Sequence, residues 1–246
     1  MNKAAPKPNT FQPDIYEKVI SQIPDTRPFS VLDVGAGEGY LSLQLHEMGC
    51  QVDACDYQAE NFKCSDIPFT TVDLNERLPF EDNQFDCTIS VEVIEHIENH
   101  FTFVREMIRV TKPNGYIIIT TPNVLNLTSR LHYYMYGYND CAPVPLDPNR
   151  EDYFMQHINP ISLPELLFHF ERFGAKLVNL TTNRLRRSSF IPMLLYPFLQ
   201  ISIRRKLLRK KHAKDFELHR RHIRWMMSVA NLMGRITIAV AQKRQE

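Results

Sequence analysis

Apolar and polar positions along this chain alternate between two periods, and the alternation predicts an α/β protein. Short apolar runs, which are typical of strands, lie at 29–34, 51–56, 69–72, 85–91 and 116–120. Apolar residues at helical spacing lie at 14–22, 40–48 and 101–110. Because parallel strands need crossover helices, this order predicts a doubly wound, mostly parallel sheet.

The second half of the chain predicts two more strands with a long insertion between them. Ser162 and Glu165 form a capping box that begins a helix. The last strands are predicted at 175–180 and 235–243, which would complete a seven-stranded sheet with a hairpin-like final pair. More than 50 residues separate these strands, far more than a hairpin needs, so we expect a helical insertion at 182–234.

The segment before the capping box differs from the sheet in composition. Residues 123–138 have the pattern of a helix with a cluster of tyrosines, and residues 141–148 contain three prolines and predict an irregular loop. We therefore expect 123–160 to form a lid over a substrate pocket. The length suits one domain, 1–246, with a sizeable core.

Composition and charge exclude several classes of protein. Of the 246 residues, 43% are hydrophobic and 23% are charged, which are globular values. A net charge of +1 gives no overall field that would attract nucleic acid. The cysteines include no Cys-x-x-Cys pair, and residues 1–8 lack the apolar core of a signal peptide. We expect a cytoplasmic, reducing setting with buried thiols at Cys55 and Cys87.

The most informative motif follows the first predicted strand. Asp33 ends that strand, and glycines follow at Gly35, Gly37 and Gly39 before a helical pattern begins at Tyr40. Glycine allows a tight turn close to a ligand, and the start of a helix offers unpaired N–H groups. A dinucleotide-binding fingerprint would need a small residue where the bulky Tyr40 stands, so the motif argues against NAD.

The run D-x-G-x-G-x-G from Asp33 to Gly39 resembles motif I of the class I S-adenosylmethionine-dependent methyltransferases. The resemblance covers about residues 29–181 and the last predicted strand. It implies S-adenosylmethionine as the cofactor, with the glycine loop around its methionine end and the acid facing its cationic part. Residues 78–86 and 91–97 are similar to the small-molecule branch that includes quinone-biosynthesis methyltransferases.

Further positions fall where the resemblance implies contacts with the cofactor. Asp56 matches the acid that meets the ribose hydroxyls, and a carboxylate can accept two hydrogen bonds from a diol. Asp73 matches the residue near the adenine amino group, and Leu74 would pack on the ring. Val91 and Glu92 match the wall near the sulfonium and the amino acid. Taken singly, Asp56 could also be a solvated strand-end carboxylate, and Asp73 a turn former.

The implied reaction is an in-line displacement at the sulfonium methyl, for which the protein supplies position and sometimes a base. A hydroxyl acceptor must lose its proton, so His96 and His157 are the candidate catalytic residues. His96 follows the fourth predicted strand at the edge where ligands bind in doubly wound folds. Two plainer alternatives stay open: His96 could bond locally at a helix start, and His157 could join the lid to the core.

We predict no metal site, although one alternative stays open. The run Glu92-x-x-Glu95-His96 is similar to a divalent-metal site in some quinone and RNA-end methyltransferases, and its oxygen ligands would suit magnesium. The same letters occur widely in metal-free relatives of the family.

The predicted insertion has a composition of its own. An apolar stretch from Phe190 to Ile203 is followed by a basic run from Arg204 to Lys211, and further arginines continue to Arg224. The stretch is too short to span a bilayer, but an apolar wedge beside basic residues suits anionic lipid. We therefore expect peripheral contact with the inner face of a membrane through Phe190 to Arg224. A helical cap or a dimer contact is the plainer interpretation.

The preferred hypothesis is a methyltransferase that modifies an oxygen of a small or lipid-linked acceptor, such as a quinone-type headgroup, a lipid or an envelope glycolipid. One alternative is a cofactor-binding protein without activity that docks on membranes or partners. The other is an RNA methyltransferase, which the apolar half of the insertion disfavours. Residues 90–93 read Ser-Val-Glu-Val and lack the Asn/Asp-Pro-Pro-Tyr/Phe motif of enzymes that methylate base nitrogens.

Overall fold

The computed structural model describes residues 6, 14–24, 29–139, 146–150, 156–194, 196–209 and 215–245. Its strands are β1 (Ser30–Val34), β2 (Gln51–Asp56), β3 (Phe69–Thr71), β4 (Phe85–Val91), β5 (Thr111–Pro122), β6 (Ala175–Thr181) and β7 (Ile236–Lys243). Its α-helices are α1 (Asp14–Ile20), α2 (Tyr40–Glu47), α3 (His100–Val110), α4 (Leu127–Tyr136), α5 (Leu163–Arg172), α6 (Phe190–Met193), α7 (Tyr196–Arg209), α8 (Phe216–Met226) and α9 (Val229–Met233). Short 3-10 helices include η2 (Ile94–His96) and η4 (Arg187–Ser189).

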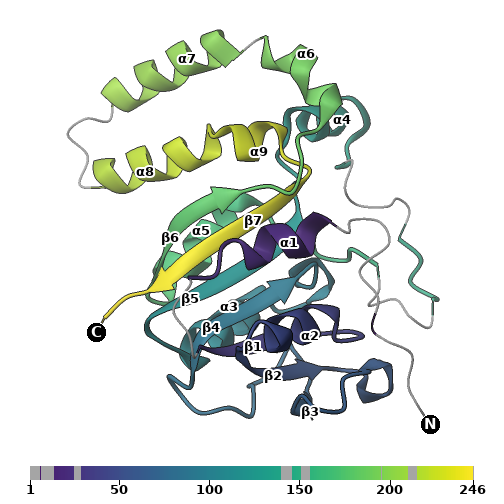
Figure 1. Cartoon of the computed structure of the whole chain (residues 1–246). Helices are drawn as coiled ribbons and strands as arrows, with labels where there is room; N and C mark the ends of the chain where they lie inside the picture. Colours follow the sequence, from purple (N-terminus) through teal and green to yellow (C-terminus); the bar gives the residue numbers. More distant parts are fainter. Residues whose placement is uncertain are drawn as a thin grey trace.

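The strands form one seven-stranded sheet in the order β3-β2-β1-β4-β5-β7-β6 (Figure 1). The pairs from β3 to β5 are parallel, and β7 runs antiparallel between β5 and β6. The prediction of a doubly wound, mostly parallel seven-stranded sheet is therefore confirmed. The chain order changes direction between β1 and β4, which is where ligands bind in open α/β sheets.

Helices cover both faces of the sheet, and the central strand shows how the core divides. In β5, Ile117 and Ile119 face a core built with α3 and α5, whereas Ile118 faces a core built with α1 and α2. All three side chains are fully buried. A strand that is apolar on both faces is typical of the centre of a parallel sheet, which explains why its sequence is continuously hydrophobic.

Two element boundaries differ from the sequence prediction. The strand predicted at 116–120 extends from Thr111 to Pro122 as β5, in which Asn114 has a φ of 62° and the pairing with β4 is irregular. The helix expected from residue 123 begins at Leu127, because Asn126 caps it and accepts a hydrogen bond from Ser129 N at 2.9 Å. A cap fixes the first turn more firmly than the hydrophobic pattern indicates.

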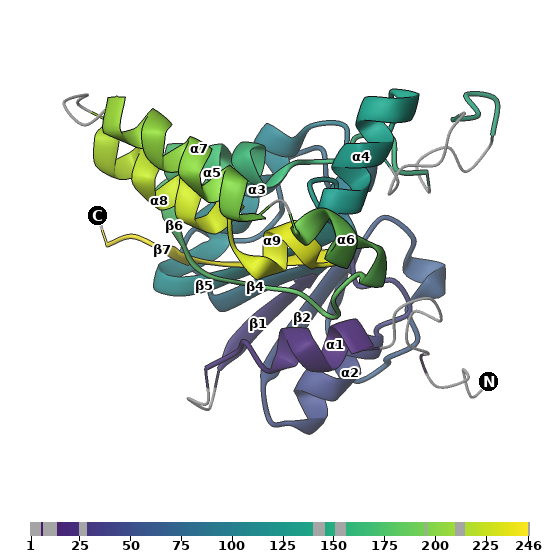
Figure 2. The same ribbon diagram turned by 90° about the horizontal axis from the view of Figure 1, so that it is seen from above.

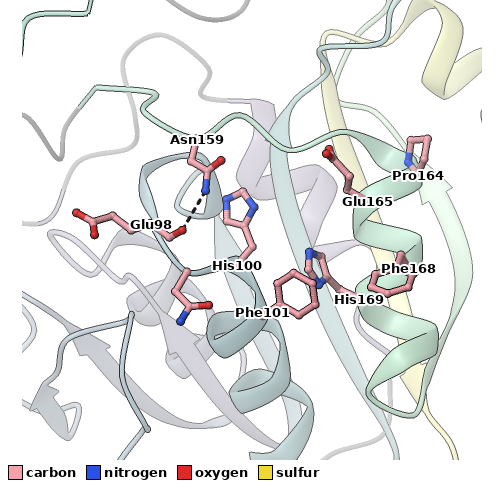
Figure 3. Close-up of a pocket in the computed structure, with 9 residues that line it drawn as sticks. Glu98, His100, Phe101, Asn159, Pro164, Glu165, Phe168 and His169 are labelled. Atoms are coloured by element: carbon pink, nitrogen blue, oxygen red, sulfur yellow. Dashed lines mark hydrogen bonds between the residues drawn. The ribbon is translucent and has the colours of Figure 1, made fainter.

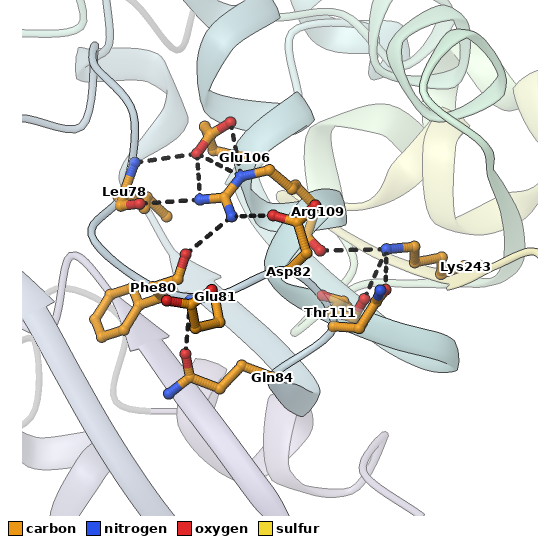
Figure 4. Close-up of polar contacts among 10 residues, drawn as sticks. Leu78, Phe80, Glu81, Asp82, Gln84, Glu106, Arg109, Thr111 and Lys243 are labelled. Atoms are coloured by element: carbon orange, nitrogen blue, oxygen red, sulfur yellow. Dashed lines mark hydrogen bonds and ion pairs between the residues drawn. The ribbon is translucent and has the colours of Figure 1, made fainter.

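A polar cluster fixes the loop between β3 and β4 against α3 (Figure 4). The Arg109 guanidinium donates to the carboxylates of Glu106 and Asp82 and to the backbone carbonyls of Leu78 and Phe80, at 2.6–3.1 Å. Lys243, at the end of β7, donates to the Thr111 carbonyl at 2.8 Å. These contacts hold the amino-terminal edge of the sheet, away from the glycine loop.

The insertion between β6 and β7 forms helices α6 to α9 beside the β6 edge of the sheet (Figures 1 and 2). Helix α8 packs on α5, where Arg221 pairs with Glu171. Helix α7 is the outermost element in this layer (Figure 1). Within the described part of the chain, no helix is long and apolar enough to cross a membrane. Most of the predicted loop at 141–148 lies outside the described residues.

Candidate functional site

The glycine loop between β1 and α2 has a backbone that other residues would adopt only with strain. Gly35, Gly37 and Gly39 have φ angles of 78°, 55° and 89°. A Cβ atom on Gly35 would lie 2.4 Å from Val93 Cγ2, and one on Gly39 would lie 2.7 Å from Phe62 Cε2. Nothing lies within 4 Å of the corresponding position on Gly37. The loop is thus packed tightly at both ends and has open space at its middle glycine.

Asp56 lies at the end of β2 and holds the middle of this loop. Its Oδ2 atom accepts a hydrogen bond from Gly37 N at 2.8 Å, and its Oδ1 atom accepts one from Tyr57 N at 2.6 Å. Each carboxylate oxygen retains a further lone pair. Asp56 is therefore more than a solvated strand-end carboxylate, because it joins β2 to the glycine loop.

Asp33 is a buried acid at the end of β1, only 2% exposed. Ser42 Oγ donates to its Oδ2 atom at 2.6 Å, so the carboxyl group is fixed against the first turn of α2. The pKa of Asp33 is raised to about 6, mainly by burial and to a smaller extent by the nearby Asp56, while the Ser42 hydrogen bond acts to lower it. A cation beside these two acids would stabilise their charged forms.

Asp73 and Leu74 follow β3, and the structure describes both of them with local partners. Asp73 is exposed, and its Oδ1 atom accepts hydrogen bonds from the backbone and side chain of Asn75 at 2.8 and 3.1 Å. Leu74 is buried in the core on the α3 side of the sheet. The turn-forming role of Asp73 is thus present in the structure, and the adenine contact of both residues stays a prediction.

Val91 and Glu92 end β4 at the edge next to β1. Val91 is half-buried, and Glu92 has a φ of 55°, a region that residues other than glycine seldom adopt. Thr120 on β5 holds Glu92 twice: its Oγ1 atom accepts from Glu92 N at 2.9 Å and donates to Glu92 Oε1 at 3.0 Å. Burial raises the pKa of Glu92 above its usual range. Strained backbone of this kind is often found at functional sites.

The two candidate bases, which are far apart in sequence, come together. The rings of His96 and His157 meet edge to face with centroids 5.0 Å apart. His96 Nδ1 lies 2.9 Å from the carbonyl oxygen of Gln156, and a carbonyl can only accept. The proton of a neutral His96 ring is therefore on Nδ1, and Nε2 carries the lone pair. Sequence reasoning missed Gln156, whose contribution comes from the backbone and has no signature.

Glu95 joins this histidine pair from the buried side. Ligand atoms of Glu95, His96 and His157 all lie within 4.8 Å of one another. Glu95 is fully buried, and neither carboxylate oxygen forms a well-aligned hydrogen bond with a described residue, although the nearby Thr121 side chain acts to lower its pKa. Burial, followed by the charge of Glu92, raises the pKa of Glu95 well above its usual range. These three residues could hold a divalent cation, so the geometry selects His157 in place of the Glu92 that the sequence run indicated.

A cavity of about 520 Å³ lies between the first turns of α3 and α5 (Figure 3). Its lining includes Glu98, His100, Phe101, Asn159, Glu165, Phe168 and His169. Asn159 closes one side through hydrogen bonds from its amide to the carbonyls of Ile97 and Glu98, at 3.1 and 3.2 Å. None of the lining residues is among the predicted site residues, so this cavity is separate from the glycine loop.

Comparison with known proteins identifies the domain. Residues 32–119 match a protein family described as "Methyltransferase domain". The chain therefore contains a methyltransferase domain, and the matched segment is about a third of its length. The matched segment contains the glycine loop, Asp56, Asp73, Glu92 and His96, whereas His157 and helices α6 to α9 of this methyltransferase chain lie beyond it.

Among curated relatives, the ubiquinone biosynthesis O-methyltransferase of Rickettsia typhi is 34% identical over 117 residues, which are 44% of this chain and 47% of that protein. The norajmaline N-methyltransferase of Rauvolfia serpentina is 30% identical over 116 residues, 43% of this chain and 40% of that protein. The alignments thus span about half or less of these relatives.

Solved structures of methyltransferases share the fold over most of the chain. A SAM-dependent methyltransferase from Archaeoglobus fulgidus has a TM-score of 0.58 and 18% identity, and the match covers 93% of both chains. This similarity extends beyond the matched family segment to β6 and β7. It supports the fold of the methyltransferase domain and carries no information on the acceptor.

Proposed function

We propose that this chain transfers a methyl group from S-adenosylmethionine to an oxygen atom of a small or lipid-linked acceptor. The observation that carries the proposal is the meeting of His96 and His157 just beyond β4, next to the strand that leads into the glycine loop. A pair of histidines at that edge suits an acceptor that must lose a proton. The oxygen as the methylated atom is supported by the O-methyltransferase relatives.

The cofactor would lie over the glycine loop, with its charged end near the buried acids. Burial is the main cause that raises the pKa values of both Asp33 and Glu92. A sulfonium or ammonium group nearby would favour their charged forms, so ionisation of the acids and binding of the cation support each other. Asp56, already fixed by Gly37 N, would direct its remaining lone pairs to the ribose hydroxyls.

His96 would act as the base. Its Nδ1–H donates to the Gln156 carbonyl, which leaves the Nε2 lone pair to take the proton of the acceptor hydroxyl. In the transfer, the acceptor oxygen forms a bond to the methyl carbon as the bond from sulfur to that carbon breaks. His157 contacts the His96 ring and would hold it at this angle or accept the proton in its place.

A second role for the same cluster is a divalent cation held by Glu95, His96 and His157. The burial of the Glu95 carboxylate beside the two histidines favours this role. A bound divalent ion would lower the pKa of a coordinated acceptor hydroxyl, and His96 would then be a ligand. Chelation separates the two roles, because transfer that depends on His96 as a base survives a chelator and transfer that depends on the ion is lost.

The test has two stages that use the full chain. Calorimetry with S-adenosylmethionine should give micromolar binding, about −8 kcal/mol, that is lost in Asp56→Ala. Transfer of labelled methyl to catechol-type and quinol-type acceptors should then fall by at least about 100-fold in His96→Ala, with His46→Ala on the exposed face of α2 as the matched control. Binding without transfer to any acceptor would favour a cofactor-binding protein without activity.

A further inference from the structure

Three helices at one end of the molecule carry an exposed apolar and aromatic surface. The contributing residues are Leu131, Tyr133, Tyr134, Met135 and Tyr136 on α4, Phe190, Ile191 and Leu194 on and after α6, and Phe198 and Ile201 on α7. We call this set the outer apolar surface. Tyr134 is 87% exposed, Ile191 78% and Phe198 71%, so most of each residue is in contact with solvent. A gathering of this size marks an interaction site in a soluble protein.

The helices that carry the surface are neighbours in space although they are distant in sequence. Thr128, in the first turn of α4, forms hydrogen bonds with Ser188 Oγ and Ser189 Oγ of η4 at 2.8 and 3.1 Å. Helix α4 contacts α6 directly, and both views place the two side by side with α7 continuing from α6 (Figures 1 and 2). Tyr196 ties the start of α7 to the end of α8 through the Met227 carbonyl at 3.4 Å.

The segments that carry the surface are basic in sequence. From Arg172 to Lys214 the sequence contains twelve lysines and arginines and no aspartate or glutamate. Of these, Arg184, Arg187 and Arg205 are among the exposed side chains. The segment from Asn123 to Tyr138 also lacks acidic residues. Helices α4, α6 and α7 therefore lie in basic or neutral segments, even though acidic residues follow on α8 and the chain as a whole is nearly neutral.

We propose that the outer apolar surface seats on an anionic lipid bilayer. Tyrosines and phenylalanines favour the boundary between headgroups and acyl chains, and nearby arginines are attracted to anionic headgroups. Aliphatic side chains such as Ile191 and Leu194 cannot pair with phosphates, which supply most of the binding energy for nucleic acid, so they favour the bilayer. The helices that carry the surface lie at the side of the domain (Figure 2), and none of them, in the part of the chain that the structure describes, can cross a bilayer, as in an interfacial contact.

The position of α4 links this surface to the proposed reaction. The helix follows β5 at the carboxyl edge of the sheet, the same edge that holds Glu92 and His96. An acceptor with an apolar tail would leave its tail in the bilayer and present its headgroup to that edge. This step rests on the proposed function, whereas binding of the bilayer does not.

Vesicle co-sedimentation with the full chain tests the proposal. Vesicles of phosphatidylcholine with one-quarter phosphatidylglycerol should bind the protein, vesicles of phosphatidylcholine alone should bind it at least about tenfold more weakly, and high salt should weaken the first. The double variant Tyr134→Ser/Phe198→Ser should bind about tenfold or more weakly than the parent. Phe101→Ser on α3, also an exposed aromatic, should bind like the parent.

Three outcomes would overturn the proposal. They are equal binding by the parent and the double variant, tighter binding to single-stranded RNA than to anionic vesicles, and a solution dimer that the double variant dissociates. Cofactor calorimetry on the same samples separates the two hypotheses. If the protein binds the cofactor but not vesicles, only the membrane proposal is rejected. If it binds vesicles but not the cofactor, only the proposed methyl transfer is rejected.

Discussion

The sheet from β1 to β5 and the outer layer from α6 to α9 are built by different rules. In the sheet, apolar side chains point into two cores, and the glycine loop at its edge has no room for a Cβ on Gly35. In the outer layer, α8 contributes no fully buried side chain, and the largest apolar residues of α6 and α7 face solvent. The comparison separates residues that stabilise the fold from residues that are available to a partner.

The largest effect is expected at the glycine loop. Gly35→Ala places a Cβ 2.4 Å from Val93 Cγ2 at a φ of 78°, so we expect a loss of about 2–4 kcal/mol of unfolding free energy and no measurable cofactor binding. Denaturant unfolding and calorimetry measure both. Gly137→Ala, at a φ of 76° with open space, should lose only about 1 kcal/mol and retain binding. Similar losses in both variants would contradict this explanation.

The next largest effect on stability is expected at the polar cluster around Arg109. Arg109→Ala leaves Glu106, which is 5% exposed, without its cation and removes two bonds to backbone carbonyls, so we expect about 2–4 kcal/mol of destabilisation. Arg105→Ala on the exposed face of the same helix should change the unfolding free energy by less than about 0.5 kcal/mol. Equal effects would mean that the cluster is not what fixes this loop.

Asp33 predicts a pH dependence of stability. Its folded pKa of about 6 exceeds the ordinary 3.8, so the stabilisation it contributes is present below about pH 4 and is lost as pH rises through about 6. The loss amounts to about 3 kcal/mol. Unfolding at several pH values should show the advantage of the parent over Asp33→Asn decreasing by that amount. An advantage that grows with pH would show that a cation already faces the acid.

The smallest effect on stability is expected in the outer layer. Tyr134→Ser and Phe198→Ser remove side chains that are mostly in solvent. The unfolding free energy, measured by thermal unfolding, should therefore change by less than about 0.5 kcal/mol in each variant. If either variant unfolds at a clearly lower temperature, that side chain packs inside the protein, and the contrast between the two regions would weaken.

The parts of the molecule that could be predicted are those with local signals. The period of the apolar residues placed β4 at its observed bounds, and Ser162 and Glu165 form the predicted capping box at α5. The meeting of His96 with His157 could only be expected in outline, because it depends on how a long segment returns to the sheet. Asn114 illustrates the other limit, because β5 continues through it although the register with β4 skips from Thr111 to Tyr116 and its φ is 62°.

The extents of the lid and the insertion and the roles of the site residues remain predictions from the sequence. The limits of the lid at 123–160 and of the insertion at 182–234 are interpretations of composition, and parts of both lie outside the described residues. The catalytic roles of His96 and His157 and the cofactor contacts of Asp73, Leu74 and Val91 depend on ligands and need the binding and transfer measurements above. For the two histidines the structure adds one observation: a ligand atom of Glu95 lies within 4.8 Å of a ring nitrogen of each.

Gln156 gives the histidine pair a property that side chains alone would not provide. Its carbonyl fixes the proton of His96, and its own amide is held in both directions by the backbone of Asp147, at 2.9 Å from Asp147 N and 2.8 Å to Asp147 O. The Asp147 backbone therefore fixes the side chain of the same residue whose carbonyl faces His96 Nδ1. If His96 is the base, as we propose, a change that separates residues 147 and 156 is expected to weaken the contact that fixes its tautomer.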